Sequence, residues 1–412
     1  MPWKVEAVAD LRREFVELAL REGSNISELC RRFGVSRKTA YKWRSRYCAE
    51  GAGGLSDRSR RPLSSPVRTS SAVEERIVKL RAEHPAWGGR KLRRWLLNQE
   101  VEGVPSASTI TEVLRRHGLL SASKLPRDFQ RFERSQPNEL WQMDFKGHFA
   151  MGDGGRCHPL TVLDDHSRYS LVLEACGNER GATVQERLIV AFRRYGLPER
   201  MLMDNGSPWG DDRESPWTPL TVWLLRVGVG VSHGRPYHPQ TQGKEERFHR
   251  TLKAEVLQGR VFRDLNDCQV CFDKWRSTYN HERPHEALDL GVPGSRYRPS
   301  VRSYPERLPE LEFSEIDAVR KVQRKGWFSF RGREWGVSKA FVGERVGVRP
   351  TTRDGVWEVW FGPQCLGEID QRADAATRRV VRRPPGEGPE SVVGGGTDSA
   401  RCAHSVCSSP NE

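Results

Sequence analysis

The hydrophobic pattern changes twice along the 412 residues of this chain, and these changes constrain the fold more than any other feature. Up to about residue 120, apolar side chains recur at spacings of three and four residues, which is typical of amphipathic helices. Between 137 and 300, strand-like runs alternate with helical ones, and from 320 to 372 short strand-like runs are separated by Gly and Asp-Gly turns. The pattern predicts a multidomain protein with all-α N-terminal modules, an α/β core with a mixed sheet, and a small C-terminal β-barrel.

Residues 1–50 are predicted to form a helix-turn-helix domain. Apolar residues at helical spacing indicate three helices, of which the first ends at Gly23 and the second at Gly34, and Ser36 is expected to cap the third. The third helix has a basic outward face, as expected of a helix that enters the major groove. The alternative is an ordinary three-helix bundle with a solvated basic face. The residues of the third helix expected to contact DNA are Arg37, Lys38, Thr39, Lys42 and Arg44.

A second helix-turn-helix-like module is predicted over residues 72–120, after a basic flexible linker at 51–71 that is rich in Gly, Ser, Pro and Arg. Its apolar residues indicate three helices, the last between Ser108 and Gly118. Another linker follows at 121–136. Two tethered modules could bind two stretches of one DNA site, because the tether raises the effective concentration of the second module.

The positive charge of the chain is concentrated in its first third. The net charge is +14, which suits polyphosphate or an anionic membrane surface, and residues 1–136 hold 28 basic and 16 acidic side chains, or +12 of it. Residues 137–300 are neutral overall and residues 301–412 carry +2. No apolar run reaches the roughly 18–20 residues of a transmembrane helix, and the start lacks the apolar core of a secretory signal. We therefore expect a cytoplasmic protein that binds DNA and not a membrane.

Three carboxylates lie where chemistry could use them. Asp144 lies inside the apolar strand WQMDF, Asp204 ends the strand in LMDNG, and Glu246 follows the turn HPQTQG at the start of a helix. Desolvating a charge inside an apolar strand is costly unless a partner or a metal compensates it. Carboxylate oxygens are preferred ligands of hard divalent cations, so three converging carboxylates predict a metal site.

The motifs around these carboxylates carry a family resemblance. WQMDF, MDNGSPW and YHPQTQGKEERFHRTLK resemble, in that order, the three motifs of retroviral integrases and of insertion-sequence transposases with an Asp-Asp-Glu core of ribonuclease H type. The resemblance covers about residues 137–300. The segment HPAWGGRK and the two N-terminal modules resemble bacterial insertion-sequence transposases more than the viral enzymes, whose paired-His, paired-Cys zinc module has no counterpart in the sequence.

The third carboxylate has a rival, because Glu245 is adjacent to Glu246. Neighbouring residues on a helix point about 100° apart, so only one of them can face the site. The match to the family motif favours Glu246, and Arg250 and Lys253 then fall on the same face with His249 beside them. The interval from Asp204 to Glu246 is longer than the family usually shows, because DDRESPWTP appears as an insertion that we expect to form a surface loop.

The resemblance implies a DDE-type transposase that pairs two transposon ends as a homo-oligomer, at least a dimer, on double-stranded DNA. Asp144 would bridge two Mg²⁺ ions, for which Mn²⁺ may substitute, and Asp204 and Glu246 would each hold one. Water would free the 3′-OH of the transposon, which would then attack target DNA. The family residues that contact DNA near the scissile end match Tyr237, Gln240, Gln242, Lys244 and Lys253. Arg250, on the helix face of Glu246, is also expected to contact DNA phosphate. Two alternatives are a non-cutting DNA-binding regulator derived from a transposase, and a nuclease that never joins strands.

Other candidates have plainer explanations. Asp164, Asp165 and His166 lie at a hairpin, where turn chemistry explains them as well as catalysis does. Cys268 and Cys271 have a CxxC spacing but lie on the apolar stripe of a helix, so buried thiols are favoured over a zinc or redox site. The tail at 373–412 has too little apolar content to fold and is predicted to be disordered.

Overall fold

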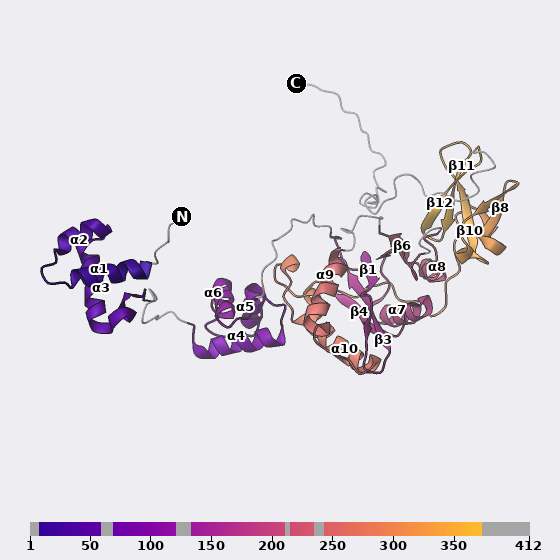
Figure 1. Ribbon diagram of the computed structural model, residues 1–412. Coiled ribbons are helices and arrows are strands. Elements are labelled where there is room, and N and C mark those ends of the chain that lie inside the picture. The colour runs from indigo at the N-terminus through magenta and orange to yellow at the C-terminus, as the bar shows by residue number, and fades with distance from the viewer. Residues whose placement is uncertain (1–7, 59–68, 121–132, 211–214, 235–242, 373–412) are drawn as a thin grey trace, which may run out of the picture. The chain divides into compact units, whose positions relative to one another are not determined.

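The computed structural model describes residues 8–58, 69–120, 133–210, 215–234 and 243–372 (Figure 1). It divides into two compact units, Met1–Arg68 and Thr69–Glu412, and each is described by itself. Among the described residues, no helix is long and apolar enough to cross a membrane. The predicted tail at 373–412 and most of the two predicted linkers lie outside the described residues.

The first unit contains the three predicted helices, α1 (Val8–Ala19), α2 (Ile26–Phe33) and α3 (Arg37–Glu50). The turn between α2 and α3 depends on Gly34, whose φ of 65° lies in the left-handed region that favours glycine. The predicted cap of α3 is present, because the Ser36 hydroxyl accepts a hydrogen bond from the backbone N–H of Thr39 at 3.2 Å. The core of the unit is formed by Phe15, Val16, Ala19, Cys30, Ala40, Trp43 and Leu55.

The start of the predicted 51–71 linker is part of this first unit. A 3-10 helix, η1 (Gly51–Leu55), follows α3, and Leu55 is buried in the core. Arg12 on α1 donates to the Leu55 carbonyl oxygen at 2.8 Å and pairs with Asp57 at 2.9 Å. The predicted boundary at residue 51 is therefore too early, because a leucine that follows two glycines packs against the helices.

The second predicted module also forms three helices, α4 (Ser71–Glu83), α5 (Gly89–Asn98) and α6 (Ala107–Arg116). Its last helix is capped by Ser106, two residues before the predicted Ser108. Gly89 allows α5 and α6 to approach closely, since a Cβ atom there would lie 2.4 Å from the Ala107 carbonyl oxygen. The apolar core is formed by Ile77, Leu80, Trp87, Leu92, Leu96, Ile110, Val113 and Leu114.

A mixed sheet forms the centre of the α/β core, as the sequence predicts. β1 pairs antiparallel with β3 and parallel with β5, and β5 pairs parallel with β6. β4 and the short β2 both pair antiparallel with β3. The strands are β1 (Leu140–Phe145), β2 (Phe149–Ala150), β3 (Arg156–Asp164), β4 (Ser170–Cys176), β5 (Arg200–Met203) and β6 (Gly230–His233).

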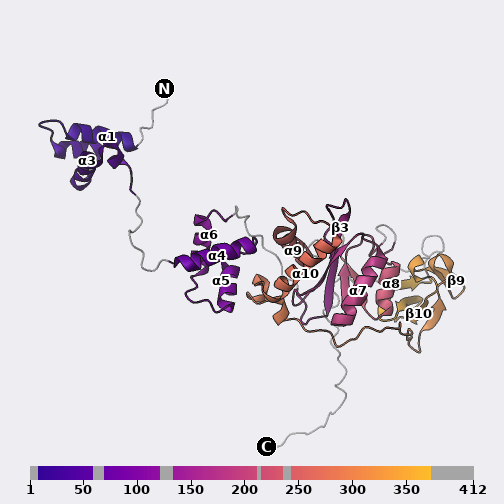
Figure 2. The ribbon, with the colours of Figure 1, turned by 90° about the horizontal axis from the view of Figure 1, so that it is seen from below.

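Helices cover both faces of this sheet (Figures 1 and 2). Leu160 and Val162 of β3 belong to a core shared with α7 (Gly181–Tyr195) and α8 (Pro219–Arg226). Leu163, next along the strand, belongs to the core of the other face, with α9 (Gly243–Leu252) and α10 (Leu265–His281). Successive side chains of β3 thus point to opposite faces of the sheet and pack against different helices. Short turns complete the core: the π-turn η3 (Lys253–Leu257) and the 3-10 helices η4 (Glu286–Leu288) and η5 (Pro293–Ser295).

The C-terminal strands form an open sheet and a hairpin. The predicted barrel is not confirmed, because no pairing among the described residues joins the two outer strands, β12 and β7. The four-stranded antiparallel sheet has the order β12-β11-β10-β7. The elements are β7 (Ala318–Lys321), β8 (Trp327–Phe330), β9 (Arg333–Gly336), β10 (Arg345–Pro350), β11 (Val356–Phe361), β12 (Gln364–Asp370), and the 3-10 helices η6 (Arg324–Gly326) and η7 (Lys339–Phe341).

The inserted segment DDRESPWTP is not a simple surface loop. Its residues 211–214 lie outside the described ones, but Trp217 is only 8% exposed and packs edge to face on Phe341, with ring centroids 5.6 Å apart. Ser215 donates a hydrogen bond to Ser338 at 3.1 Å. The described part of the segment therefore attaches the C-terminal strands to the core. Burying the large apolar surface of Trp217 stabilises this contact.

Candidate active site

Asp144 and Asp204 meet at one edge of the sheet. Asp144 lies near the end of β1, and Asp204 directly follows β5, which runs parallel to β1. Burial raises the pKa of Asp144 to about 7, and the negative charge of Asp204 contributes to this rise. Because β1 and β5 are neighbouring parallel strands, their ends place the two carboxylates at the same edge of the sheet.

Asp204 is oriented by the loops around it. Its Oδ1 accepts a hydrogen bond from the backbone N–H of Gly206 at 3.0 Å. Its carbonyl oxygen lies 2.8 Å from Nδ1 of His233, a buried residue at the end of β6. The third parallel strand thus helps to fix the backbone of Asp204.

Glu245, and not Glu246, faces the interior beside Asp144. Glu245 is 1% exposed, and its pKa is raised well above the usual value by burial and by the charge of Asp144. Its Oε1 atom is buried and has no hydrogen-bond partner among the described residues. Glu246 is exposed on the adjoining face of α9. Among the residues that the structure describes, Asp144, Asp204 and Glu246 do not form a group whose oxygens all lie within 4.8 Å of one another.

A buried polar network links Asp144 to Glu245. The Thr161 hydroxyl lies 2.9 Å from the Asp144 carbonyl oxygen, 3.0 Å from Oε2 of Glu245 and 2.9 Å from Nε2 of His249. Nδ1 of His249 lies 3.9 Å from a carboxylate oxygen of Asp144. Burial lowers the pKa of His249 to about 3, so the imidazole is neutral at physiological pH.

His249 was predicted to lie beside the face of Glu246, Arg250 and Lys253, and it lies on the adjoining buried face of the same helix. His249 is 8% exposed and belongs to the face of Glu245, four residues before it, whereas Arg250 and Lys253 are exposed. Thr161 was missed altogether, because a threonine in an apolar strand gives no signal of its own. The spacing of Glu245 and His249 is the signal that could have found this network, since residues i and i+4 share a helix face.

Lys244 does not lie at an open surface. Its ammonium group pairs with the fully buried Asp165, and burial lowers its pKa to about 8 against the opposing effect of that carboxylate. Oδ1 of Asp165 also accepts from Gln142 at 2.7 Å. Lys244 therefore takes part in a buried ion pair, and its contact with DNA stays a prediction.

Asp164 and His166 take part in the hairpin, as turn chemistry predicts. Oδ1 of Asp164 accepts from the backbone N–H of Ser167 at 2.7 Å, and its Oδ2 accepts from the backbone N–H of Asn138 at the same distance. Nδ1 of His166 lies 2.9 Å from the Arg134 carbonyl oxygen. One of these bonds is local to the turn, and the other two tie the hairpin to the segment before β1.

The remaining predicted DNA contacts fall into two groups. Arg37, Lys38 and Lys42 are exposed on α3, and Thr39 and Arg44 are half-buried there. Tyr237, Gln240 and Gln242 lie outside the described residues. Cys268 and Cys271, the CxxC pair, are free thiols, the first buried and the second half-buried.

Family models match most of the described chain. An integrase core domain matches residues 134–239 and a second integrase core model matches 227–293. A helix-turn-helix domain matches 11–62, and a homeodomain-like domain matches 39–114. The C-terminal domain of IS481 family transposases matches 317–377.

Curated proteins of bacterial mobile elements are similar to most of this chain. The chain is 28% identical to an uncharacterized 31.7 kDa protein of insertion element IS407 from Burkholderia multivorans, over 67% of this chain and 92% of that protein. It is 24% identical to the transposase of transposon Tn552 from Staphylococcus aureus, over 80% of this chain and 76% of that protein. It is 26% identical to a 39.2 kDa protein of insertion element IS476 from Xanthomonas euvesicatoria, over 61% and 71%.

The order of these matches agrees with the architecture described above. Helix-turn-helix domains precede a mixed sheet that brings Asp144 and Asp204 together, and the C-terminal strands coincide with the IS481-type domain. The chain is thus a DDE transposase with an integrase-like catalytic core.

Proposed function

We propose that this transposase binds the terminal inverted repeats of an insertion sequence, cleaves the transposon ends and joins the 3′-OH to target DNA. The observation that carries the proposal is the placement of Asp144 and Asp204 at the ends of the neighbouring parallel strands β1 and β5, where the negative charge of Asp204 contributes to the raised pKa of Asp144. A divalent cation would relieve this repulsion, and carboxylate oxygens suit Mg²⁺, with Mn²⁺ as a substitute. The residues present therefore fit the cofactor.

Two ions bound there would activate the attacking oxygen, stabilise the leaving oxygen and keep the two in line. Asp144, Asp204 and Glu246 would hold these ions. Glu246 would be the third ligand because it is exposed, whereas Glu245 is 1% exposed and lies away from bound DNA. The unpartnered Oε1 of Glu245 nevertheless makes it the rival, and the two residues can be separated by experiment.

The side chains around the carboxylates would position them and the DNA. Thr161 and His249 hold Glu245 and the backbone of Asp144 in place. Arg250 and Lys253 are exposed beyond Glu246, where they would bind phosphates of the transposon end. The transposase would act on double-stranded DNA as a homo-oligomer, at least a dimer, that pairs two ends.

The proposal is tested with the full-length protein and a duplex that carries the terminal repeat found beside its own gene. With Mg²⁺ or Mn²⁺ we expect strand cleavage that leaves a 3′-OH, followed by joined products on a gel. Excess EDTA should abolish both reactions, because the carboxylates cannot activate an oxygen without the cation. Specific binding without cleavage under either metal would instead support the non-cutting regulator, and cleavage that persists in EDTA would contradict the metal mechanism.

The N-terminal unit is expected to supply most of the salt-dependent affinity for the repeats. Changing Arg37, Lys38 and Lys42 together to alanine should reduce the slope of log affinity against log salt by about 0.9 for each phosphate that is no longer neutralised, or about 3 in all. Fluorescence anisotropy of a labelled repeat between low and moderate salt measures this slope. The matched control changes Arg13 and Arg21, exposed residues of α1 and its end, and equal slopes in both variants would contradict the assignment of α3.

A further inference from the structure

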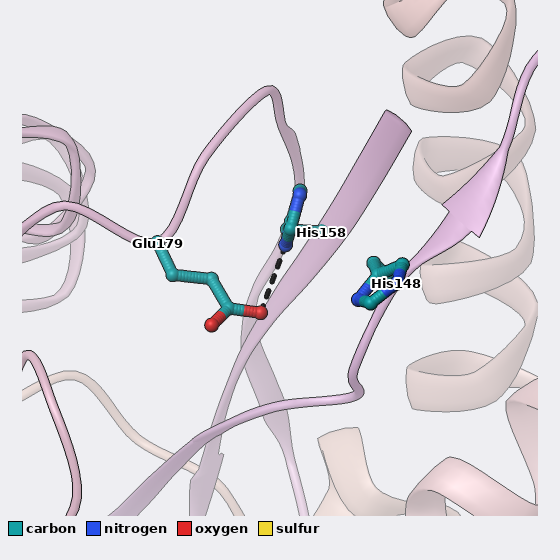
Figure 3. A group of neighbouring side chains, drawn as sticks. All are labelled: His148, His158 and Glu179. Carbon is teal, nitrogen blue, oxygen red and sulfur yellow. Dashed lines mark hydrogen bonds and ion pairs between the residues drawn. The ribbon is translucent and has the colours of Figure 1, made fainter. Parts of the chain in front are cut away.

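A second group of metal-ligating side chains lies in the core, apart from the proposed catalytic carboxylates. His148, His158 and Glu179 each offer one ligand atom, and these atoms all lie within 4.8 Å of one another (Figure 3). The residues come from three segments: the turn between β1 and β2, strand β3, and the loop that leads from β4 to α7. Among the described residues this is the one such group of histidine, cysteine and carboxylate ligands.

Strand pairing brings the three residues together. β2 pairs with β3 through Phe149 and Cys157, which places the turn that carries His148 beside His158. β4 pairs with the same strand through Cys176 and His158, so the loop that follows β4 carries Glu179 to the other side of the imidazole. In Figure 3 the His158 ring lies between the other two side chains. His158 lies on a strand of the sheet, and the strand pairing fixes the ends of the turn and the loop that carry His148 and Glu179.

The distances and exposures suit an ion that arrives from solvent. Nδ1 of His158 lies 2.8 Å from Oε1 of Glu179, and the two imidazole centroids lie 5.2 Å apart. The His158 side chain is 17% exposed and that of Glu179 is 39% exposed. Arg156 contacts Nε2 of His148, but both residues are exposed, so the guanidinium can move aside.

The plainer explanation is a surface ion pair between His158 and Glu179 with a second histidine nearby. Such a pair needs no third ligand, and exposed pairs contribute little to stability. The combination of two imidazoles and one carboxylate is instead a set that binds transition-metal ions while leaving positions open. Mg²⁺ prefers oxygen ligands alone, so this donor set differs from that of Asp144 and Asp204.

We infer that His148, His158 and Glu179 bind one divalent transition-metal ion, of the class of Zn²⁺, at a site distinct from the catalytic carboxylates. The site lies near the catalytic carboxylates, since the negative charge of Glu179 contributes to the raised pKa of Asp144. Its open coordination positions would take water or a phosphate oxygen of bound DNA. The inference does not depend on the proposed reaction, because the ligands are not those of the cleavage site.

The test uses full-length protein stripped of metal with a chelator and titrated with Co²⁺, whose visible absorption becomes strong when a protein holds it with four or five ligands. Zn²⁺ binding is measured separately by calorimetry. We expect the wild type to bind one equivalent through His148, His158 and Glu179 with an absorption band, in addition to any ion held by Asp144 and Asp204. His148→Ala should lose this equivalent without changing the thermal midpoint, because His148 is exposed. His158→Ala should lose it too, and Asp204→Asn should keep it.

The control variant is His117→Ala, which removes an exposed histidine that pairs with Glu74 in the second helical module. It should leave the bound equivalent and the band intact. A wild type that binds no more Co²⁺ or Zn²⁺ than His148→Ala would overturn the inference, as would a band that disappears only in Asp204→Asn. Neither result would affect the proposed cleavage reaction, which is measured with Mg²⁺ and DNA.

Discussion

Glu246→Gln is expected to lower the rate of strand cleavage and joining by at least roughly a thousandfold, which corresponds to about 4 kcal/mol of lost transition-state stabilisation. The physical reason is the loss of one negative charge that would hold a divalent cation, while the neutral amide is a weaker ligand. Glu246 is exposed, so the thermal midpoint should change little. Asp144→Asn and Asp204→Asn are the reference variants, since both should lower the rate as much as Glu246→Gln does. The measurement is the single-turnover rate on the terminal-repeat duplex in Mg²⁺.

Glu245→Gln is the matched control, one residue away on the same helix. Burial and the charge of Asp144 raise the pKa of Glu245 well above its usual value, which favours the neutral form of its carboxyl group. A glutamine has nearly the same shape and stays neutral, and it can still bond to the Thr161 hydroxyl. We expect activity within about tenfold of the wild type. An inactive Glu245→Gln beside an active Glu246→Gln would show that the buried carboxyl is the third ligand. In that case Glu245→Gln should also bind Mn²⁺ more weakly than Glu246→Gln in calorimetry.

The helix face of α9 could have been read more closely from the sequence. Phe248 and Leu252 are its apolar residues, and both are buried. Glu245 lies three residues before the first and seven before the second, which puts it on the same face. The family motif predicts that Glu246 is the metal ligand, while the apolar periodicity predicts that Glu245 is buried. The two signals describe different faces of one helix, and the motif alone could not show that a second carboxyl lies beneath the site.

The positions of the core strands can be predicted from the local hydrophobic pattern, whereas the pairing of strands far apart in sequence cannot. The proximity of Asp144 and Asp204 follows once β1 and β5 are parallel, because their ends then meet at one edge. Turn residues mark the C-terminal strands, but they do not say which outer strands meet, so closure into a barrel was not predictable. The role of Trp217 was hidden for a similar reason, since its partner Phe341 lies more than a hundred residues away in sequence.

Stability of the core should depend strongly on the buried pair of Glu255 and Arg283. Their side chains are 3% and 7% exposed, and Oε1 of Glu255 lies 3.3 Å from Nε of Arg283. The other oxygen of Glu255 accepts a hydrogen bond from the indole N–H of Trp275 on α10 at 2.8 Å. Glu255 lies in the π-turn that ends α9, so it joins the helix that carries Glu246 to α10 and to the segment after it.

Glu255→Leu should therefore lower the free energy of unfolding of the core by about 3–5 kcal/mol, because it leaves the Arg283 charge buried and unpaired and the Trp275 indole without an acceptor. Urea unfolding followed by tryptophan fluorescence measures the loss. The double variant Glu255→Leu with Arg283→Met should recover most of it, since no buried charge remains. The matched control is Glu286→Ala, which breaks the exposed pair with Arg247 at 3.9 Å and should cost less than about 1 kcal/mol. If Glu255→Leu and Glu286→Ala cost the same, the buried pair does not hold α9 against α10, and the position of Glu246 must be fixed by the apolar contacts of Phe248 and Leu252 alone.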